Sequence, residues 1–318
     1  MSYSSMFKVI LFVGMIYTFK SFIQKKLPKI VINSCKNKEN RENRENRENR
    51  KQCIISSKNK KSCCYESQYF ISNKNEILNN KKLITISPGG YKGFYLLGIL
   101  TYIKENYNTE NLIFSGASAG AWNSLFMSYK GDTMKFVYNF LDENIRRAKS
   151  ITELQYFIKY KLLSTYKTED FDLTKVFIGV TTFNKFKLNT NIYTDFNDLE
   201  DAICCCMASS HIPLITGGIT NIYKNMFSLD GGFSDYPYLD KQKLLHISLS
   251  MWDELKGMNC GKNFIKRKLL TIQNFSEFFS FSKNNLLELF DTGYEDAKIH
   301  KEYLDDIFER KYEDLLEF

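Results

Sequence analysis

Two strand–glycine loop–helix units follow each other in this chain, and they constrain its fold more than any other feature. In the first unit, the apolar, β-branched run 83–87 leads through the loop 88–93 into an amphipathic stretch, 94–107. In the second, the apolar run 112–115 leads through the turn 116–120 into another helical stretch. Consecutive units of this kind pair their strands in parallel. The sequence therefore predicts an α/β fold with a mainly parallel sheet sandwiched between helices.

The turn of the second unit has the pattern Gly-x-Ser-x-Gly, with Ser118 at its centre. Between a strand and a helix this pattern forms a nucleophile elbow, in which the serine hydroxyl projects at the carboxyl edge of the sheet. The same pattern also fits a packing turn. Its place between a strand and a helix favours the catalytic interpretation, so we predict Ser118 as a nucleophile in an elbow made by Gly116, Ala117, Ala119 and Gly120.

The loop of the first unit offers backbone donors for the charge that such a nucleophile creates. Attack on an acyl carbonyl places negative charge on its oxygen, and consecutive N–H groups at a helix start stabilise that charge. Pro88 has no N–H, so the predicted oxyanion-hole residues are Gly89, Gly90, Lys92 and Gly93. A nucleotide-phosphate loop is disfavoured, because neither the Walker ending Gly-Lys-Ser/Thr nor a complete GxGxxG is present.

A third site is Asp230-Gly231-Gly232, which follows the apolar run 226–229. Glycines after an aspartate at a strand end give the backbone the freedom to turn the carboxylate toward a neighbouring loop. Taken alone, the segment also fits an ordinary Asp-Gly turn.

The three glycine-marked sites, at 89–93, 116–120 and 230–232, occur in an order that resembles the patatin-like phospholipase family. Two further stretches, 208–213 and 293–297, are similar to segments of the same family. The resemblance thus extends from the first predicted strand to near the end of the chain.

The resemblance implies a lipid acyl hydrolase with a Ser–Asp dyad and no cofactor or metal. Ser118 would attack the acyl carbonyl, Asp230 would take its proton, and water would later release the fatty acid from the acyl-enzyme. The chain departs from the family at Pro88, where the family's loop opens with glycine. Pro88 therefore supports an alternative, a catalytically impaired lipid-binding or scaffold protein.

A second alternative is a Ser-His-Asp triad, because an aspartate is a weak base unless its pKa is raised by an apolar site. The chain has three histidines, and the order Ser, Asp, His is met by His246 or by His300. His246 lies in a predicted strand, 244–249, where alternation decides its face, and His300 lies in a charged helical stretch.

Charge divides the chain into a basic arm and a mildly acidic body. Residues 1–82 contain 18 basic and 6 acidic side chains, a difference of +12, and since the whole chain carries +8 the rest carries −4. A basic arm on an acidic body argues against a nucleic-acid-binding core and favours contact with an anionic membrane surface.

The arm begins with an apolar run, 9–19, which is shorter than the roughly 20 residues that a membrane-spanning helix needs. Lysines follow it and no small-residue cleavage site does, which favours a spanning or interfacial membrane anchor over a signal peptide, with the catalytic body in the cytosol. The expected organisation is an anchor at 1–30, a basic linker with four Glu-Asn-Arg repeats at 31–82, a catalytic core at 83–257 and a helical part of the same domain at 258–318.

Neither the cysteines nor the aromatic cluster near the C-terminus predicts a further site. The clusters 63–64 and 204–206 lack the spacing of zinc ligands and are expected to be reduced, with 204–206 as packing residues in a helix. Palmitoylation of Cys35 or of the 63–64 pair would add a second membrane signal. The aromatic stretch 275–281 is expected to pack in the core or to form a lid.

Overall fold

The computed structural model describes residues 67–69, 78, 80–184, 187–253 and 285–311. The chain divides into two units, Met1–Cys64 and Tyr65–Phe318, and the described residues belong to the second. The predicted anchor, the Glu-Asn-Arg repeats and the aromatic stretch 275–281 lie outside the described residues. Within the described part of the chain, no helix combines the length and the apolar character needed to cross a bilayer.

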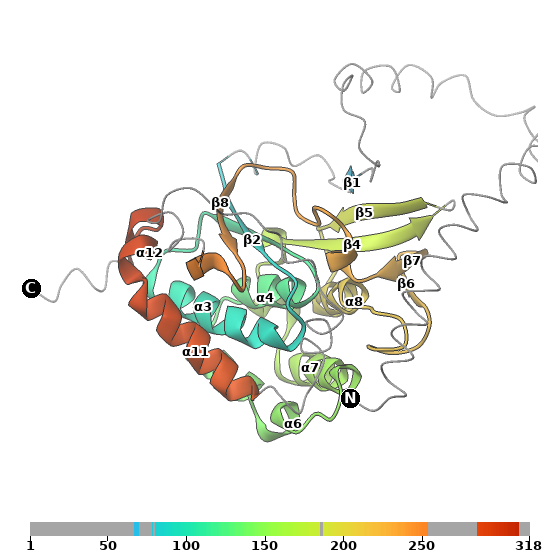
Figure 1. Ribbon diagram of the computed structural model, residues 1–318, viewed down its shortest axis with the longest axis horizontal. Helices are drawn as coiled ribbons and strands as arrows, with labels where there is room; N and C mark the ends of the chain where they lie inside the picture. The colour runs from blue at the N-terminus through green and yellow to red at the C-terminus, as the bar shows by residue number, and fades with distance from the viewer. Residues whose placement is uncertain (1–66, 70–77, 79, 185–186, 254–284, 312–318) are drawn as a thin grey trace, which may run out of the picture. The chain divides into compact units, whose positions relative to one another are not determined.

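A mixed, mainly parallel sheet forms the centre of this unit (Figure 1). Its strands follow the order β1 (Ser67–Tyr69), β5 (Lys187–Tyr193), β4 (Val176–Asn184), β3 (Leu112–Gly116), β2 (Lys82–Ile86) and β8 (Lys243–Ile247). Two more strands, β6 (Asn221–Tyr223) and β7 (Met226–Leu229), join through antiparallel pairing of β7 with β4. Apart from the antiparallel β4–β5 pair, the strands of the main path are parallel.

Both predicted strand–loop–helix units are present. Strand β2 leads into η4 (Gly90–Lys92) and α3 (Gly93–Asn106), and β3 leads into α4 (Ala119–Met127). The two strands pair in parallel and their last residues, Ile86 and Gly116, lie opposite each other. The glycine loop and the elbow therefore leave the sheet at the same edge.

The remaining described helices and 3-10 turns surround the sheet-forming segments in the sequence. They are α5 (Thr133–Phe140), α6 (Glu143–Arg146), α7 (Ile151–Thr165), α8 (Leu199–Ser209), α11 (Leu286–Ile299) and α12 (Lys301–Ile307), with 3-10 turns η5 (Thr168–Asp170), η6 (Leu173–Lys175) and η7 (Gly231–Phe233). Polar residues cap several of them, since the side chains of Asp132, Asp142, Ser150, Asp198 and Asn285 each accept a backbone N–H of the first turn.

Alternation along the strands gives the sheet two different faces. One face carries Ile84, Phe114 and Ile178, which belong to the large core shared with the helices. The opposite face carries a smaller cluster that includes Ile113 and Phe177. The segment after η7 crosses this second face, where the hydroxyl of a strand residue, Ser115, accepts the N–H of Leu239 and the ring of Tyr238 meets His246 edge-on. The predicted fold class, a mainly parallel sheet flanked by helices, is thus confirmed.

Two glycines explain how α11 packs against α3. A Cβ on Gly98 would lie 2.1 Å from the carbonyl oxygen of Phe290, and one on Gly293 would lie 2.0 Å from that of Tyr95. The two helices therefore cross at backbone contact. The Tyr95 hydroxyl also donates to Asp296, at 2.6 Å. The stretch 293–297, singled out in the sequence, is the part of α11 that makes this crossing.

The compact unit begins earlier than the sequence pattern indicates. The predicted linker ends at residue 82, whereas β1 at Ser67–Tyr69 already pairs in parallel with β5. A three-residue edge strand joins a sheet through backbone hydrogen bonds and needs no apolar pattern. This is why the polar segment Ser67-Gln68-Tyr69 gives no strand signal.

Candidate active site

Ser118 lies at the predicted elbow, in a backbone conformation that the turn imposes. Its φ is 53° and its ψ is −121°, a left-handed conformation that is rare for a residue with a side chain. The flanking glycines permit this bend. A Cβ on Gly116 would lie 2.1 Å from the carbonyl oxygen of Gly120, and one on Gly120 would lie 2.1 Å from that of Ile86. The elbow therefore holds α4 in direct backbone contact with the ends of two strands.

Asp230 is hydrogen-bonded to Ser118 in the structure. Ser118 Oγ donates to Asp230 Oδ2 at 2.6 Å, and the Gly232 N–H donates to Asp230 Oδ1 at 2.7 Å. Asp230 directly follows β7, whose residue Leu229 pairs with Thr181 of β4. The antiparallel pairing of β7 thus returns the chain to the edge where Ser118 lies.

Gly231 allows this close approach. A Cβ at that position would lie 2.2 Å from the carbonyl oxygen of Gly179 and 2.8 Å from the Cβ of Ala117. The Asp-Gly-Gly segment is therefore packed directly against both β4 and the elbow, which an ordinary solvent-exposed turn would not require.

The environment of Asp230 makes its carboxylate a stronger base than usual. The side chain is buried, with 5% exposed, and burial raises the pKa of Asp230 to about 6. The hydrogen bonds from Ser118 and from the Gly232 N–H act in the opposite direction and lower that pKa. The sequence does not show whether Asp230 lies in an apolar site that raises its pKa. In the structure it is buried, and this burial raises the pKa.

Ser209, at the end of α8, fixes the backbone of Ser118. Its hydroxyl accepts the Ser118 N–H at 2.8 Å and donates to the carbonyl oxygen of Gly179 at 2.7 Å. The side chain is completely buried. Ser209 therefore ties the elbow to β4 and satisfies an N–H that the bend would otherwise leave without a partner.

The glycine loop forms a tight 3-10 turn before α3. The Lys92 N–H donates to the Gly89 carbonyl at 3.0 Å, and the Gly93 N–H is directed to the carbonyls of Gly90 and Tyr91. Within the described residues, the N–H groups of Gly89 and Gly90 have no hydrogen-bond partner. Of the four predicted oxyanion-hole residues, Lys92 and Gly93 thus use their N–H groups within the turn, and the other two keep theirs available.

Gly93 and Pro88 have packing roles at this loop. A Cβ on Gly93 would lie 2.6 Å from the Cβ of Ala119, so the start of α3 packs closely on the start of α4. The ring of Pro88 lies beside Gly232, where a Cβ would be 3.1 Å from the proline Cγ. Pro88, which departs from the family pattern, therefore contacts the Asp-Gly-Gly segment.

An apolar pocket opens onto the pair. Ser118, Asp230 and Gly90 line it together with side chains from α3, α4, α5 and α7. The apolar lining includes Phe94, Leu97, Phe126, Phe140, Leu154 and Ile158. A pocket with this lining has the apolar character that a hydrocarbon group requires.

Among the described residues, no histidine side chain is hydrogen-bonded to Ser118 or Asp230. His246 Nδ1 is hydrogen-bonded to Thr85 Oγ1 at 2.8 Å, on the sheet face opposite to Ile86 and the helices. Burial lowers the pKa of His246 to about 4. His300 stacks on Trp252, with ring centroids 4.3 Å apart. The oxygens of Asp230 are hydrogen-bonded to Ser118 and to a backbone N–H, not to either ring.

His211 contributes to the site through its backbone. Its carbonyl oxygen accepts the Asp230 N–H at 2.7 Å. Next to it, the Ser210 hydroxyl accepts the Trp122 Nε1–H at 3.1 Å. The stretch 208–213 was singled out in the sequence as a match to a family segment, but no local pattern indicated that it would contact both members of the pair.

Comparison with known proteins identifies the domain. The family model for Patatin-like phospholipase matches residues 84–240. No curated protein matches the chain. Among solved structures, VipD from Legionella pneumophila aligns with 14% identity and a TM-score of 0.39, over 73% of this chain and 68% of VipD.

A second solved structure is the heterodimeric complex ExoU-SpcU from the type III secretion system of Pseudomonas aeruginosa, at 12% identity and a TM-score of 0.31. The alignment covers 73% of this chain and about half, 53%, of the matched chain. The family match includes the glycine loop, the elbow and the Asp-Gly-Gly segment in one stretch. Residues 84–240 of this chain thus match the patatin-like phospholipase family, whose members act on lipid substrates.

Proposed function

We propose that this protein hydrolyses carboxylic esters of membrane lipids, as a phospholipase-type acyl hydrolase, with Ser118 as nucleophile and Asp230 as its base. The observation that carries the proposal is the 2.6 Å hydrogen bond from Ser118 Oγ to Asp230 Oδ2, in a buried site beside an apolar pocket. Nucleophile and base are within the distance that proton transfer requires.

In the first half of the reaction, Ser118 Oγ attacks the acyl carbonyl and its proton passes to Asp230. When the tetrahedral intermediate collapses, the C–O bond to the alcohol breaks and Asp230 returns the proton to the departing oxygen. In the second half, Asp230 takes a proton from water, the hydroxide adds to the acyl-enzyme, and the fatty acid leaves as Ser118 regains its proton.

The negative charge on the intermediate is stabilised by backbone donors. The N–H groups of Gly89 and Gly90 precede a helix start and have no partner among the described residues. Ala119 is the first residue of α4 and follows the nucleophile, the position whose N–H serves this role in elbow enzymes. These three N–H groups form the proposed oxyanion hole, with Lys92 and Gly93 shaping its turn.

The lipid substrate and the cellular setting are part of the same proposal. The apolar pocket would hold an acyl chain, and the basic arm with its predicted anchor at 1–30 would keep the body at a membrane surface on the cytosolic side.

Serine-dependent release of fatty acid tests the proposed function. We expect the full chain to release fatty acid from mixed phospholipid and triacylglycerol vesicles, and to react with a fluorophosphonate probe. Ser118→Ala should abolish both, whereas Ser164→Ala, which removes an exposed serine hydroxyl on α7, should change neither. A folded wild-type protein without activity or labelling would favour a lipid-binding scaffold, and Pro88→Gly would then show whether the proline is the cause.

The pKa of Asp230 predicts the pH dependence of hydrolysis. A base must be ionised to accept a proton, so kcat/KM for a soluble short-chain ester should rise with pH through about 6 and level off above 7. If His246 were the base, the rise would instead centre near its pKa of about 4. A profile that is flat between pH 5 and 7 would contradict the role given to Asp230.

A further inference from the structure

The apolar pocket beside Ser118 follows two helices that lead away from this residue in the same direction. Ser118 is the N-cap of α4, and the residues of α4 that line the pocket continue to Phe126. The residues of α7 that line it include Gln155 and Leu162. Gln155 Nε2 lies 3.5 Å from the carbonyl oxygen of Ser210, which also lines the pocket at its Ser118 end. The start of the pocket is therefore at Ser118 and Gln155.

Aromatic rings close the other end of the pocket, where both helices end. Phe136 and Phe171 line the pocket, and only 3% and 4% of them is exposed. Their ring centroids are 6.4 Å apart, and the Tyr129 ring lies 4.8 Å from the first and 5.4 Å from the second. Tyr166, which follows α7, stacks on Phe136 at 5.0 Å. Phe136 and Phe171 are here called the aromatic floor.

Backbone pairing holds the aromatic floor in place. Tyr129 and Phe171 form an antiparallel bridge. Next to it, the Asp172 N–H donates to the Ser128 carbonyl oxygen at 2.8 Å. The end of α4 is thus tied to the segment that carries Phe171, so this ring does not move without breaking backbone hydrogen bonds.

A polar recess lies beyond the aromatic floor. Tyr129 and Tyr166, whose rings contact the floor, line this recess together with the polar and charged residues Asp132, Lys135, Asn139 and Asp170. An alkyl chain that passed the floor would displace water from these side chains, which costs free energy. The end of a bound acyl chain therefore stops at the aromatic floor.

The distance from Ser118 to the floor determines which chains fit. From Ser118 to Phe126, α4 rises about 12 Å. The Phe126 ring packs on Phe136, with centroids 5.4 Å apart, so α4 reaches the floor at this point. From Gln155 to Leu162, α7 rises about 10 Å. A stretched chain advances about 1.1–1.2 Å per bond, so an extended acyl chain of about ten to twelve carbons fills this distance.

We propose that Phe136 and Phe171 limit the length of the acyl chain that the pocket accepts, so that esters of medium-chain fatty acids, up to about twelve carbons, are the preferred substrates. The inference rests on the proposed function. Longer acyl chains are cleaved more slowly, because they have to bend back toward Ser118 or displace buried aromatic rings.

A series of p-nitrophenyl esters, from octanoyl to hexadecanoyl, tests this limit in the full-length protein. In mixed micelles of one nonionic detergent, every acyl chain already lies in hydrocarbon, so each further methylene gains little by entering the pocket. We expect similar kcat/KM for the octanoyl, decanoyl and dodecanoyl esters and a value at least about tenfold lower for the hexadecanoyl ester. Equal kcat/KM over the whole series overturns the proposal.

Two substitutions in the pocket should move the limit in opposite directions. Phe136→Ala frees the space of a benzyl group, so the ratio of hexadecanoyl to dodecanoyl kcat/KM should rise about tenfold. Ile158→Phe adds a ring on α7 between Gln155 and Leu162, so the ratio of dodecanoyl to octanoyl kcat/KM should fall about tenfold. If Phe136→Ala does not fold, Ile158→Phe still decides the test. Variants that change kcat/KM for every ester by the same factor overturn the proposal.

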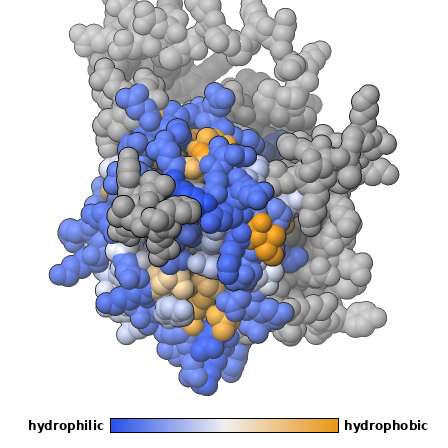
Figure 2. Space-filling model, turned by 90° about the vertical axis from the view of Figure 1, so that its left-hand side faces the viewer, coloured by the Kyte–Doolittle hydropathy of each residue, from blue (hydrophilic) through white to orange (hydrophobic). Residues whose placement is uncertain are grey.

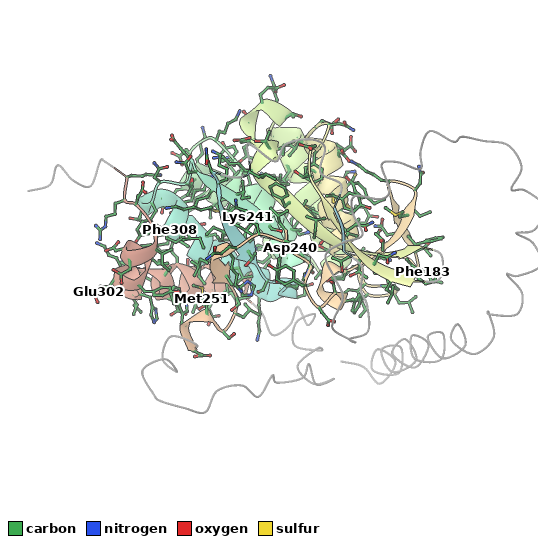
Figure 3. All side chains as sticks on the ribbon, turned by 90° about the horizontal axis from the view of Figure 1, so that it is seen from above. Phe183, Asp240, Lys241, Met251, Glu302 and Phe308 are labelled. Atoms are coloured by element: carbon green, nitrogen blue, oxygen red, sulfur yellow. The ribbon has the colours of Figure 1, made fainter. Side chains whose placement is uncertain are left out.

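Phe308→Ala is the matched control, since it also removes a buried phenylalanine ring. Phe308 is 6% exposed and packs on Tyr107, with ring centroids 5.5 Å apart. Figure 3 places it near Glu302, at the α11–α12 end. The face at that end is mainly hydrophilic, with apolar residues in small separate patches (Figure 2). We expect the chain-length profile of Phe308→Ala to equal that of wild type. A shift like that of Phe136→Ala would contradict the role of the floor.

Fatty-acid binding separates failure of this inference from failure of the proposed function. In full-length Ser118→Ala protein, with fatty acids below their micelle concentrations, affinity should rise about threefold to fourfold per methylene from octanoate to dodecanoate. It should rise no further at hexadecanoate, unless Phe136→Ala is also present. If wild type hydrolyses no ester, the proposed function fails, and binding still decides the limit. Affinity that rises evenly to hexadecanoate with the floor intact, or no binding of any chain, overturns the inference.

Discussion

Asp230→Asn is expected to reduce kcat on a soluble ester by about 10³-fold or more, the scale on which loss of a catalytic base acts. Asparagine has nearly the same shape, and its amide oxygen can still accept the Gly232 N–H that Asp230 accepts now. It cannot take the Ser118 proton, however. The rate of fluorophosphonate labelling at Ser118 should fall together with kcat, because both depend on the same deprotonation.

His246→Ala is the matched control, since it removes the side chain that a Ser-His-Asp triad would need. Because that ring contacts Thr85 and Tyr238 and not the dyad, we expect activity to remain within a few-fold of wild type. The reverse pattern, with labelling that survives Asp230→Asn and is lost in His246→Ala, would contradict the dyad and establish the triad.

Stability separates a chemical from a structural effect of Asp230→Asn. The pKa of Asp230 in the folded state, about 6, lies above the value of about 4 for an unfolded aspartate. The folded state therefore binds the proton more tightly, and the free energy of unfolding decreases as pH rises through 4 to 6. Asparagine avoids the cost of ionisation, so Tm at pH 8 should be equal to or above that of wild type. If the Tm of Asp230→Asn were lower than that of wild type, its loss of activity would be explained by a disturbed fold.

Gly120→Ala is expected to destabilise the protein by about 3 kcal/mol or more, which lowers Tm by roughly 6–12 °C for a domain of this size. The new Cβ would lie 2.1 Å from the Ile86 carbonyl oxygen and 2.9 Å from that of Ser87. Both contacts are with backbone, so the clash is relieved only by moving α4 away from β2. That movement displaces Ser118 from the glycine loop, and labelling should fall as well.

Gly218→Ala is the control for this prediction. A Cβ on Gly218 would meet no described atom within 4 Å, so we expect a change within about 0.5 kcal/mol. Thermal unfolding and Ser118 labelling of both variants provide the test. If Gly120→Ala were as stable as the control, this result would contradict the close backbone contact between α4 and β2.

The half of the fold that carries the candidate active site could be predicted from local patterns. Apolar runs that end in glycine turns predicted β2, β3 and the helices after them. The tight bends have no room for side chains, so they require glycines, and these glycines are recognisable in the sequence. The Gly-x-Ser-x-Gly and Asp-Gly-Gly patterns likewise indicate Ser118 and Asp230, which are hydrogen-bonded to each other in the structure.

The remaining features depend on contacts that leave no local pattern. Ser209 is one of several serines in the chain, and only the packing of α8 against β4, next to the elbow, gives its hydroxyl a role. The short strand β1 joins the sheet by pairing with β5, which its three residues do not indicate. The availability of the Gly89 and Gly90 N–H groups depends on the 3-10 turn, which the sequence pattern of the loop does not specify.

The distance in sequence between the two residues of the proposed dyad also has a consequence for synthesis. Ser118 and its partner Asp230 are separated by 112 residues, and Asp230 is positioned by pairing of β7 with β4. At about 5–20 residues per second, Asp230 leaves the ribosome roughly 6–22 s after Ser118. Under the proposed mechanism, the nascent chain therefore carries Ser118 without its base, and lipid cleavage becomes possible only when most of the domain has emerged and folded.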